Sequence, residues 1–221
     1  VSASDVWLFV SSYGSLSAGR DCPEKAMFPY VTDDKIHDGF FHTGSVAVFQ
    51  VGSGSHARVW EPFNQEQNFR YNVDRTIYKN LLGTKLYFEE VNHDLKLTYR
   101  YCLSASNKFG LVKFCRLSSN SHAPISVTVC SGFQNLLPAE VPRALQQVSS
   151  NLVDAYKLNE IDSSSALGVY SLYSGITDKP EPFEALRATS VFSIGLESAS
   201  FLSSTDQLSA FKRGATISPQ H

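Results

Sequence analysis

The stretch of sequence that decides the fold lies at residues 95–103 and reads Leu-Lys-Leu-Thr-Tyr-Arg-Tyr-Cys-Leu. Successive side chains of a β-strand point to opposite faces, so an apolar residue at every second position is typical of an antiparallel strand with one buried face. The pattern places the following residues on that buried face: Leu95, Leu97, Tyr99, Tyr101 and Leu103. The opposite face carries Lys96, Thr98, Arg100 and Cys102.

Other stretches rich in aromatic and β-branched residues extend this pattern into an all-β protein. They lie at 45–51, 69–79, 84–91, 109–117, 125–133, 167–177 and 186–196. Within 125–133, the residues expected on one side are Ile125, Val127, Val129 and Phe133. Turn-forming residues separate the strands at 80–83, 92–94, 104–108, 118–124 and 178–182.

A short turn favours antiparallel pairing of the two strands that it connects. Residues 95–133 are therefore predicted to form a three-stranded meander beside the preceding hairpin. A sheet this wide needs a second sheet to cover its apolar face. We therefore expect residues 1–221 to form a single domain, a two-sheet antiparallel β-sandwich with one or two short helices.

One amphipathic stretch follows Pro142 and is the helical candidate. Its apolar residues are Leu145, Val148, Leu152, Val153 and Tyr156. We expect this helix to cross between the sheets and to seal one end of the sandwich with Leu145, Val148, Leu152 and Tyr156. Its polar residues Gln146, Asn151 and Asp154 either cap neighbouring backbone or face a partner domain.

Composition excludes several classes of function. The chain has 19 Lys plus Arg, 21 Asp plus Glu and no basic cluster, which argues against a nucleic-acid partner. No apolar run approaches the roughly 20 residues of a membrane span, and no signal peptide is visible. We expect no membrane partner and no cofactor.

The four cysteines have no CxxC spacing, which argues against a zinc site. Free thiols in the core are the favoured interpretation. A disulfide between Cys102 and Cys115 in an extracellular protein is the alternative, because these residues lie on neighbouring predicted strands. The compartment stays open, with the cytoplasm favoured.

No nucleophile elbow, phosphate-binding loop, dinucleotide fingerprint or HExxH motif is present. His93 and Asp94 are adjacent, but a predicted turn explains them. Glu89 and Glu90 should face opposite sides of a strand, so they cannot act as a carboxylate pair. Either one is expected to be solvated or salt-bridged. We therefore assign no catalytic residue and no metal ligand.

Arg75 and Trp60 are the candidates for carbohydrate binding that the residues themselves indicate. Arg75 shares a strand face with apolar residues and needs an acceptor there: a carboxylate, a sugar hydroxyl or, as the favoured alternative, an internal salt bridge. Trp60 precedes Glu61 and Pro62 and could stack on a sugar ring, although tryptophan in a sandwich more often lies in the core.

The run at 132–138 reads Gly-Phe-Gln-Asn-Leu-Leu-Pro, followed by Ala-Leu-Gln-Gln at 144–147 and Ser-Asn-Leu-Val-Asp-Ala-Tyr at 150–156. With further runs at 8–12, 18–20, 28–30, 60–63, 88–95 and 184–189, these stretches resemble the N-terminal β-sandwich of large bacterial cellobiose-phosphorylase-like proteins. The similarity spans nearly the whole chain.

This resemblance implies a galactose-mutarotase-like super-β-sandwich that packs on an (α/α)-barrel, and in such families the barrel carries the catalytic groups. On this interpretation the 221 residues are a fragment of a larger carbohydrate-active enzyme, a glycoside phosphorylase or hydrolase. The chain alone is not expected to be catalytic. Asn151 and Asp154 join Trp60 and Arg75 as candidate carbohydrate-binding residues, and a homodimer is left open.

Two other functions are kept as alternatives. One is a free-standing carbohydrate-binding module in which Trp60 and nearby tyrosines stack on a glycan. The other is a mutarotase-type epimerase, which needs a histidine and a carboxylate facing each other across a cleft. The nearest candidates for that pair are His93, His122 and Glu89.

Overall fold

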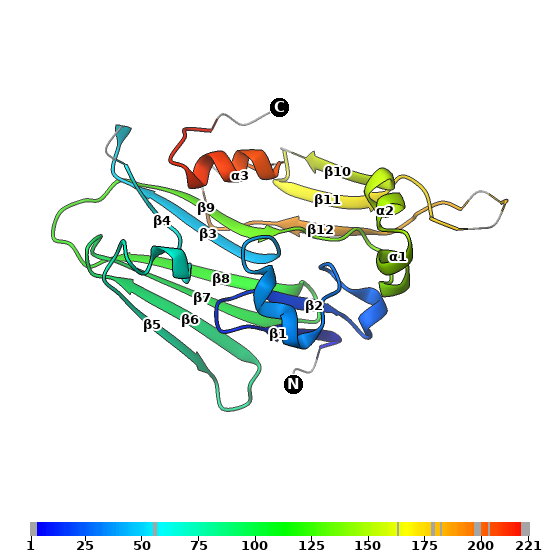
Figure 1. Cartoon of the computed structure of the whole chain (residues 1–221), viewed down its shortest axis with the longest axis horizontal. Coiled ribbons are helices and arrows are strands. Elements are labelled where there is room, and N and C mark those ends of the chain that lie inside the picture. Colours follow the sequence, from blue (N-terminus) through cyan, green and yellow to red (C-terminus); the bar gives the residue numbers. More distant parts are fainter. Residues whose placement is uncertain are drawn as a thin grey trace.

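The computed structural model describes residues 4–54, 57–162, 164–177, 180–181, 183–196, 200–202 and 204–217. Within these residues the strands form one four-stranded sheet, two three-stranded sheets and a two-stranded hairpin. Figure 1 shows the four-stranded sheet below the second sheet, with the third sheet and the helices around them. The strands pair antiparallel throughout these residues, so the expected all-β sandwich is confirmed. None of the described helices has the length and apolar character of a membrane span.

The four-stranded sheet contains the stretch on which the sequence analysis began. Its strands are β5 (Val73–Lys79), β6 (Lys85–Asn92), β7 (Leu97–Ser106) and β8 (Gly110–Ser119), in that order across the sheet. The predicted inward residues are all buried, Leu95 just before β7 and the other four within it, which confirms the alternation. Cys102, predicted on the wet face, is also buried, because its cross-strand neighbours Tyr87 and Phe114 lie on either side of it.

The second sheet consists of β4 (Arg58–Trp60), β3 (Gly44–Val51) and β9 (Val127–Gln134), in that order. The prediction of a meander over residues 95–133 was wrong at its last strand. β9 pairs with β3 along its whole length instead of with β8. Residues 120–126 are long enough to carry the chain from one sheet to the other. Pairing with both β4 and β9 buries β3, and this outweighs the preference of consecutive strands to pair with each other.

Aromatic rings fill the space between these two sheets. The ring of Phe49 lies 4.9 Å from Tyr99 and 5.1 Å from Trp60, and Phe88 stacks on Tyr101 at 4.7 Å. Rings of this size supply most of the buried apolar area of a small sandwich. The core therefore depends on side chains from both sheets.

A hairpin that the sequence analysis did not predict closes one side of this core. It consists of β1 (Val6–Val10) and β2 (Leu16–Arg20), followed by short 3₁₀ helices at Pro23–Lys25 and Asp33–Gly39. Leu16 and Ala18 of β2 are buried against the aromatic cluster. Gly14 in the turn has a φ of 91°, and a Cβ there would overlap the Tyr101 hydroxyl. The turn therefore requires glycine.

The outer face of the β4–β3–β9 sheet is covered by α3 (Thr205–Lys212), which the sequence analysis also missed. A capping box begins this helix, with Ser204 and Gln207 bonding each other's backbone amides. Phe211 is buried among Val46, Val48 and Val59. β3 is thus buried on both faces, which hides the period-two pattern of a half-exposed strand.

The third sheet contains β10 (Lys157–Asp162), β11 (Leu167–Leu172) and β12 (Ala188–Phe192), in that order. β11 and β12 lie within predicted strands, whereas β10 was not predicted. Residues 178, 179 and 182 of the turn expected at 178–182 lie outside the described residues.

The predicted helix forms as two pieces, α1 (Arg143–Val148) and α2 (Ser150–Tyr156), which link β9 to β10. Ser149 between them has a φ of −141°, which is not helical. This break turns Val153 into the core and leaves Val148 84% exposed. The expectation that Val148, Leu152 and Tyr156 seal the sandwich was therefore wrong, while Leu145 does pack against the small core there.

We expect α3 to contribute to the stability of the whole sandwich. Replacing Phe211 with alanine removes a buried ring, which should lower the free energy of unfolding by about 2–4 kcal/mol. Phe114 of β8 is largely exposed, so Phe114→Ala should change it by less than about 0.5 kcal/mol. Urea unfolding of the two variants measures both values, and equal small effects would show that α3 is dispensable.

Candidate functional site

Trp60 lies in the interior and not on the surface. Its side chain is fully buried at the end of β4, against Phe49. The indole Nε1 donates a hydrogen bond of 2.6 Å to Oε1 of Glu90. The ring cannot stack on a sugar, so this candidate was wrong and the core alternative holds.

The buried carboxylate of Glu90 organises the centre of the molecule. The side chain is 1% exposed. Besides the Trp60 bond, its Oε2 accepts from the backbone amide of Phe63 at 2.6 Å and from Nε of Arg75 at 2.6 Å. A buried carboxylate is tolerated only when charged or polar donors satisfy it in this way. The favoured interpretation of Arg75, an internal salt bridge, agrees with this contact.

The side chain of Arg75 also reaches the protein surface. It is 20% exposed and lines an open hollow of about 380 Å³. The other residues of this hollow are Asn68, Tyr71, Asn72 and Val73. We call it the Arg75 hollow. Of the four predicted carbohydrate-binding residues, Arg75 is the one that reaches both the buried network and a concave surface.

Backbone contacts fix the walls of the Arg75 hollow. The Tyr71 hydroxyl donates to the backbone carbonyl of Val59 at 2.8 Å. The amide of Asn72 donates to Oδ2 of Asp94 at 2.7 Å, and its carbonyl accepts from the amide of His93. A 3₁₀ helix at Gln65–Gln67 precedes these residues and begins at Asn64, whose side chain accepts from Glu66.

Asn151 and Asp154 lie on α2, at the other end of the molecule from β5 (Figure 1). Both are exposed, and Asp154 forms an ion pair with Lys157 at 2.7 Å. Gln146 on α1 bonds the amide of Tyr30 and the carbonyl of Val141, as the capping interpretation predicted. The fold therefore does not bring the helical candidates near Trp60 or Arg75.

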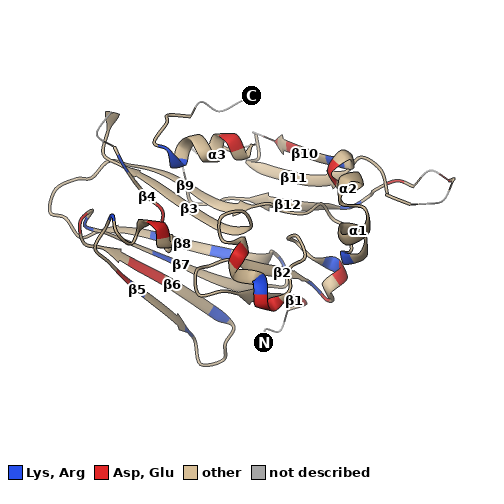
Figure 2. Cartoon of the chain, viewed as in Figure 1, with Lys and Arg blue, Asp and Glu red and all other residues tan. Residues whose placement is uncertain are grey.

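His93 and Glu89 are each bonded to a partner of their own, so these two candidate acid and base groups do not face one another. Nε2 of His93 lies 2.7 Å from Oδ2 of Asp74, and Glu89 accepts from Nε of Arg100 at 2.6 Å. These are exposed pairs on the surface, and Glu89 and Glu90 point to opposite faces as expected. Figure 2 shows acidic and basic residues interspersed along the strands and helices.

Neither a histidine–carboxylate cleft nor a metal site forms from these groups. His122 is exposed and shares no hydrogen bond with His93 or Glu89. No group of three or more His, Cys, Asp or Glu side chains suited to a metal occurs in the part of the chain that the structure describes. Nothing in this arrangement supports the epimerase alternative.

The cysteines are free, and a Cys102–Cys115 bridge is sterically excluded. In the β7–β8 register, Tyr101 lies opposite Cys115 and Cys102 lies opposite Phe114. The two thiols therefore point to different faces of the sheet. Cys115 instead accepts a hydrogen bond from the Tyr99 hydroxyl at 3.2 Å.

Lys113 is an internal lysine that the sequence analysis did not single out. From β8, its Nζ donates to the backbone carbonyls of Val46 at 2.7 Å and Gly132 at 3.2 Å. It therefore links the edge of the four-stranded sheet to β3 and β9. Burial lowers the pKa of Lys113 to about 8, against a smaller opposing effect of Cys115 and Cys130. A lysine in the middle of a strand is the only sequence signal for it.

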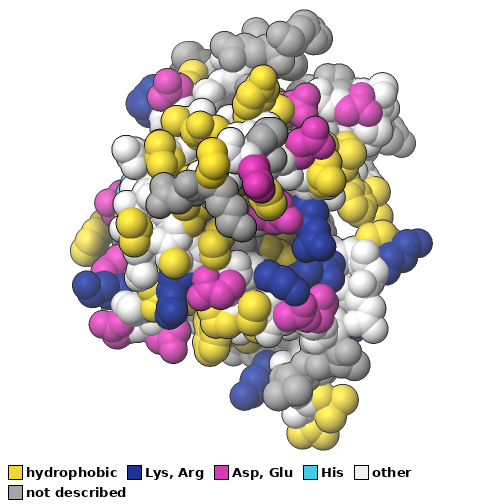
Figure 3. Space-filling view, turned by 90° about the vertical axis from the view of Figure 1, so that its right-hand side faces the viewer, with side chains coloured by type: hydrophobic (Ala, Val, Ile, Leu, Met, Phe, Trp, Pro, Cys, Tyr) yellow, Lys and Arg dark blue, Asp and Glu magenta, His cyan; other side chains and the backbone are white. Residues whose placement is uncertain are grey.

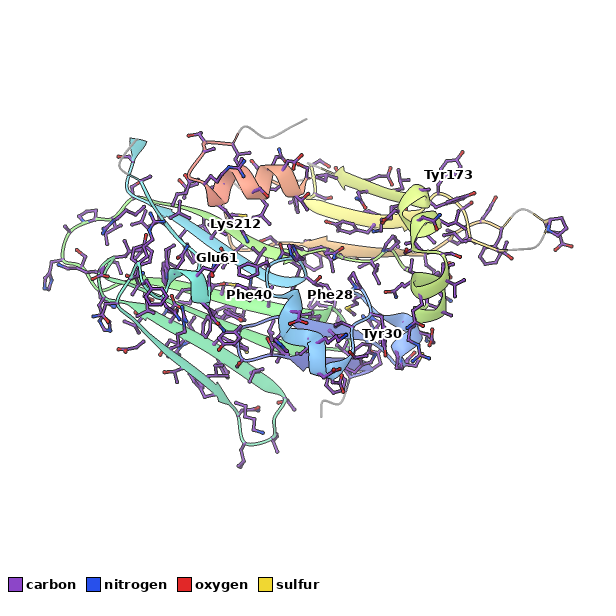
Figure 4. All side chains as sticks on the ribbon, in the orientation of Figure 1. Phe28, Tyr30, Phe40, Glu61, Tyr173 and Lys212 are labelled. Carbon is purple, nitrogen blue, oxygen red and sulfur yellow. The ribbon has the colours of Figure 1, made fainter. Side chains whose placement is uncertain are left out.

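A second buried ion pair attaches α3 to the sheet below it. Nζ of Lys212 lies 2.7 Å from Oε1 of Glu61, and Nδ2 of Asn64 donates to the other carboxylate oxygen at 3.0 Å. Figure 4 labels Lys212 at the end of α3 and Glu61 beneath it. These interactions account for Glu61 as a structural residue.

No protein-family model and no curated protein matches this sequence.

The two adjacent glutamates of β6 offer a matched test of the buried network. Glu90→Gln leaves Arg75 without its counter-charge, and we expect the free energy of unfolding to fall by about 3 kcal/mol or more. Glu89→Gln breaks only the exposed pair with Arg100, so a loss below about 1 kcal/mol is expected. Urea unfolding at pH 7 compares them, and equal losses would contradict the role given to Glu90.

Lys113 should make stability depend on pH. Its pKa is about 8 in the folded chain and 10.5 as the ordinary value, so the unfolded chain binds more protons between these values. The free energy of unfolding should then rise with pH above about 8. Below that pH Lys113 is protonated in both states, so it adds no pH dependence. Lys113→Met removes this contribution.

The measurement is urea unfolding of both proteins from pH 6 to 9.5. The quantity compared is the difference between wild type and Lys113→Met. It is measured again with Cys115→Ser and Cys130→Ser present in both proteins, because Lys113 interacts with these two thiols and their ionisation would otherwise not cancel. The difference should shift in favour of wild type above pH 8. A difference that stays constant across the range would rule out the lowered pKa.

Proposed function

We propose that this chain is an accessory β-sandwich domain of a carbohydrate-active enzyme, a glycoside phosphorylase or hydrolase, and that it packs on a separate (α/α)-barrel catalytic domain. On this proposal the chain is not catalytic alone. The observation that carries it is a concentration of exposed apolar side chains at one end of the molecule.

This apolar end is formed by α1, α2, β10–β12, the segments that connect them and residues 193–196 after β12. It holds half of the large exposed hydrophobic residues found in the described part of the chain: Val148, Leu152, Tyr156, Leu158, Ile161, Tyr173, Phe183, Leu186, Phe192, Ile194 and Leu196. Figure 3 looks onto this end and shows hydrophobic side chains in several groups, with charged side chains among them. Clusters of exposed apolar side chains of this kind mark interaction surfaces.

The third sheet at the apolar end has little core of its own. Its buried cluster consists of Leu137, Val141, Val153 and Leu172. A three-stranded sheet needs a well-covered hydrophobic face to be stable in water. A second folded domain resting on β10–β12 would supply that cover, which supports an accessory role over a free-standing one.

The state of the ionisable groups supports the non-catalytic part of the proposal. Within the described residues, Glu61, Glu89, Glu90, Asp74 and Asp154 are each held in an ion pair. General acid and base catalysis needs such groups directed at a shared substrate position. The resemblance at 132–138 and 150–156 supplies the carbohydrate class and the barrel as partner.

The activity test uses the purified 221-residue chain with cellobiose and other β-glucosides, with and without inorganic phosphate. Release of neither glucose nor glucose 1-phosphate above the blank is expected. The gene is the second test, because the proposal requires an (α/α)-barrel in the same reading frame. Turnover by the isolated chain, or a gene that encodes only this sandwich, would contradict the proposal.

The apolar end is tested by a triple variant, Tyr173→Ser, Leu186→Ser and Ile194→Ser. We expect it to lower the binding of an anilinonaphthalene sulfonate dye and to weaken association with the barrel domain, because the docking surface has become polar. Leu81→Ser, Leu82→Ser and Phe114→Ser form the control, since these residues are equally exposed elsewhere. Equal effects of both triples would argue against a localised docking surface.

A further inference from the structure

We infer that the Arg75 hollow binds a neutral carbohydrate ring. This inference is independent of the docking proposal, because β5 and the apolar end lie at opposite ends of the molecule (Figure 1). The hollow measures about 380 Å³, which is at the lower end of the usual range for small-molecule sites. Its ligand class follows from the charge, the hydrogen-bonding groups and the apolar surface around it.

The charge of Arg75 is compensated inside the protein. Its Nε lies 2.6 Å from the Glu90 carboxylate, and its Nη2 donates to the carbonyl of Asn64 at 3.1 Å. Arg70 and Asp94, which contact the walls of the hollow, carry opposite charges. The hollow therefore offers guanidinium donors without an excess of positive charge, which favours hydroxyl groups over a carboxylate or phosphate.

The rim of the hollow supplies amides that match hydroxyl groups. Asn68 and Asn72 are exposed, and their side-chain amides make no hydrogen bond within the described residues. Each amide has a donor and an acceptor, as has each hydroxyl of a sugar. A polyol can therefore satisfy both amides without leaving a charge unpaired.

An apolar surface adjoins these polar groups. Tyr71 lines the hollow but is 7% exposed, and its hydroxyl bond to Val59 holds it in place. Phe69, next to Asn68 in the chain, is 101% exposed. Aromatic side chains beside polar groups suit a ligand with one apolar and one hydroxylated face, which is the character of a pyranose ring.

Binding is expected to be weak because the hollow is open. The probes are methyl β-glucoside, methyl α-mannoside and cellobiose, followed by amide NMR spectra of the folded chain. At least one of them should give saturable shifts around residues 68–75, with a Kd in the millimolar range. Glucuronate, which has the same ring with a carboxylate, should bind no more tightly than the glucoside.

The variants separate the hollow from the rest of the surface. Asn68→Ala with Asn72→Ala should weaken binding at least tenfold, and Phe69→Ala should weaken it several-fold. Phe114→Ala, an exposed aromatic elsewhere, should leave it unchanged, and circular dichroism should show the same fold in all of them. No saturable shift with any neutral probe, unchanged affinity in the double variant, or tighter binding of glucuronate would overturn the inference.

Discussion

The carboxylate of Glu90 is the constraint on which the rest of the structure depends. A charged group this deeply buried must be surrounded by donors, because desolvating it without them would cost more than the fold can supply. Trp60, Phe63 and Arg75 provide those donors from β4, the turn after it and β5. The network therefore fixes how the two sheets of the sandwich face each other.

Comparable polar links hold the remaining layers. Lys113 lies on β8, at the opposite edge of the four-stranded sheet from Arg75, and bonds β3 and β9 through their backbone carbonyls. Glu61 and Lys212 attach α3 to the outer face. In each case a long charged side chain crosses between elements whose apolar faces already pack together. The charged groups therefore set how these elements are positioned relative to one another, while the aromatic core supplies most of the stability.

The two functional proposals occupy different ends of this framework. The Arg75 hollow stands on the rigid Glu90 network, so its guanidinium is held in place before any ligand arrives. The apolar end stands on the small third sheet, where few residues are buried. A rigid polar hollow suits a small ligand, whereas a broad apolar surface with a small core suits a second protein domain.

The sequence by itself determined most of the strands, because alternation in β7 and the runs around β3, β5, β6, β8 and β9 are local properties of the chain; β1, β2, β4 and β10 were missed. It also identified Arg75 as an arginine needing an acceptor. Only the tertiary structure decided that β9 leaves the meander, that Trp60 is internal and that Glu90 is the acceptor. Those outcomes depend on contacts between residues far apart in the chain, and period-two patterns carry no information about which strand or side chain lies opposite.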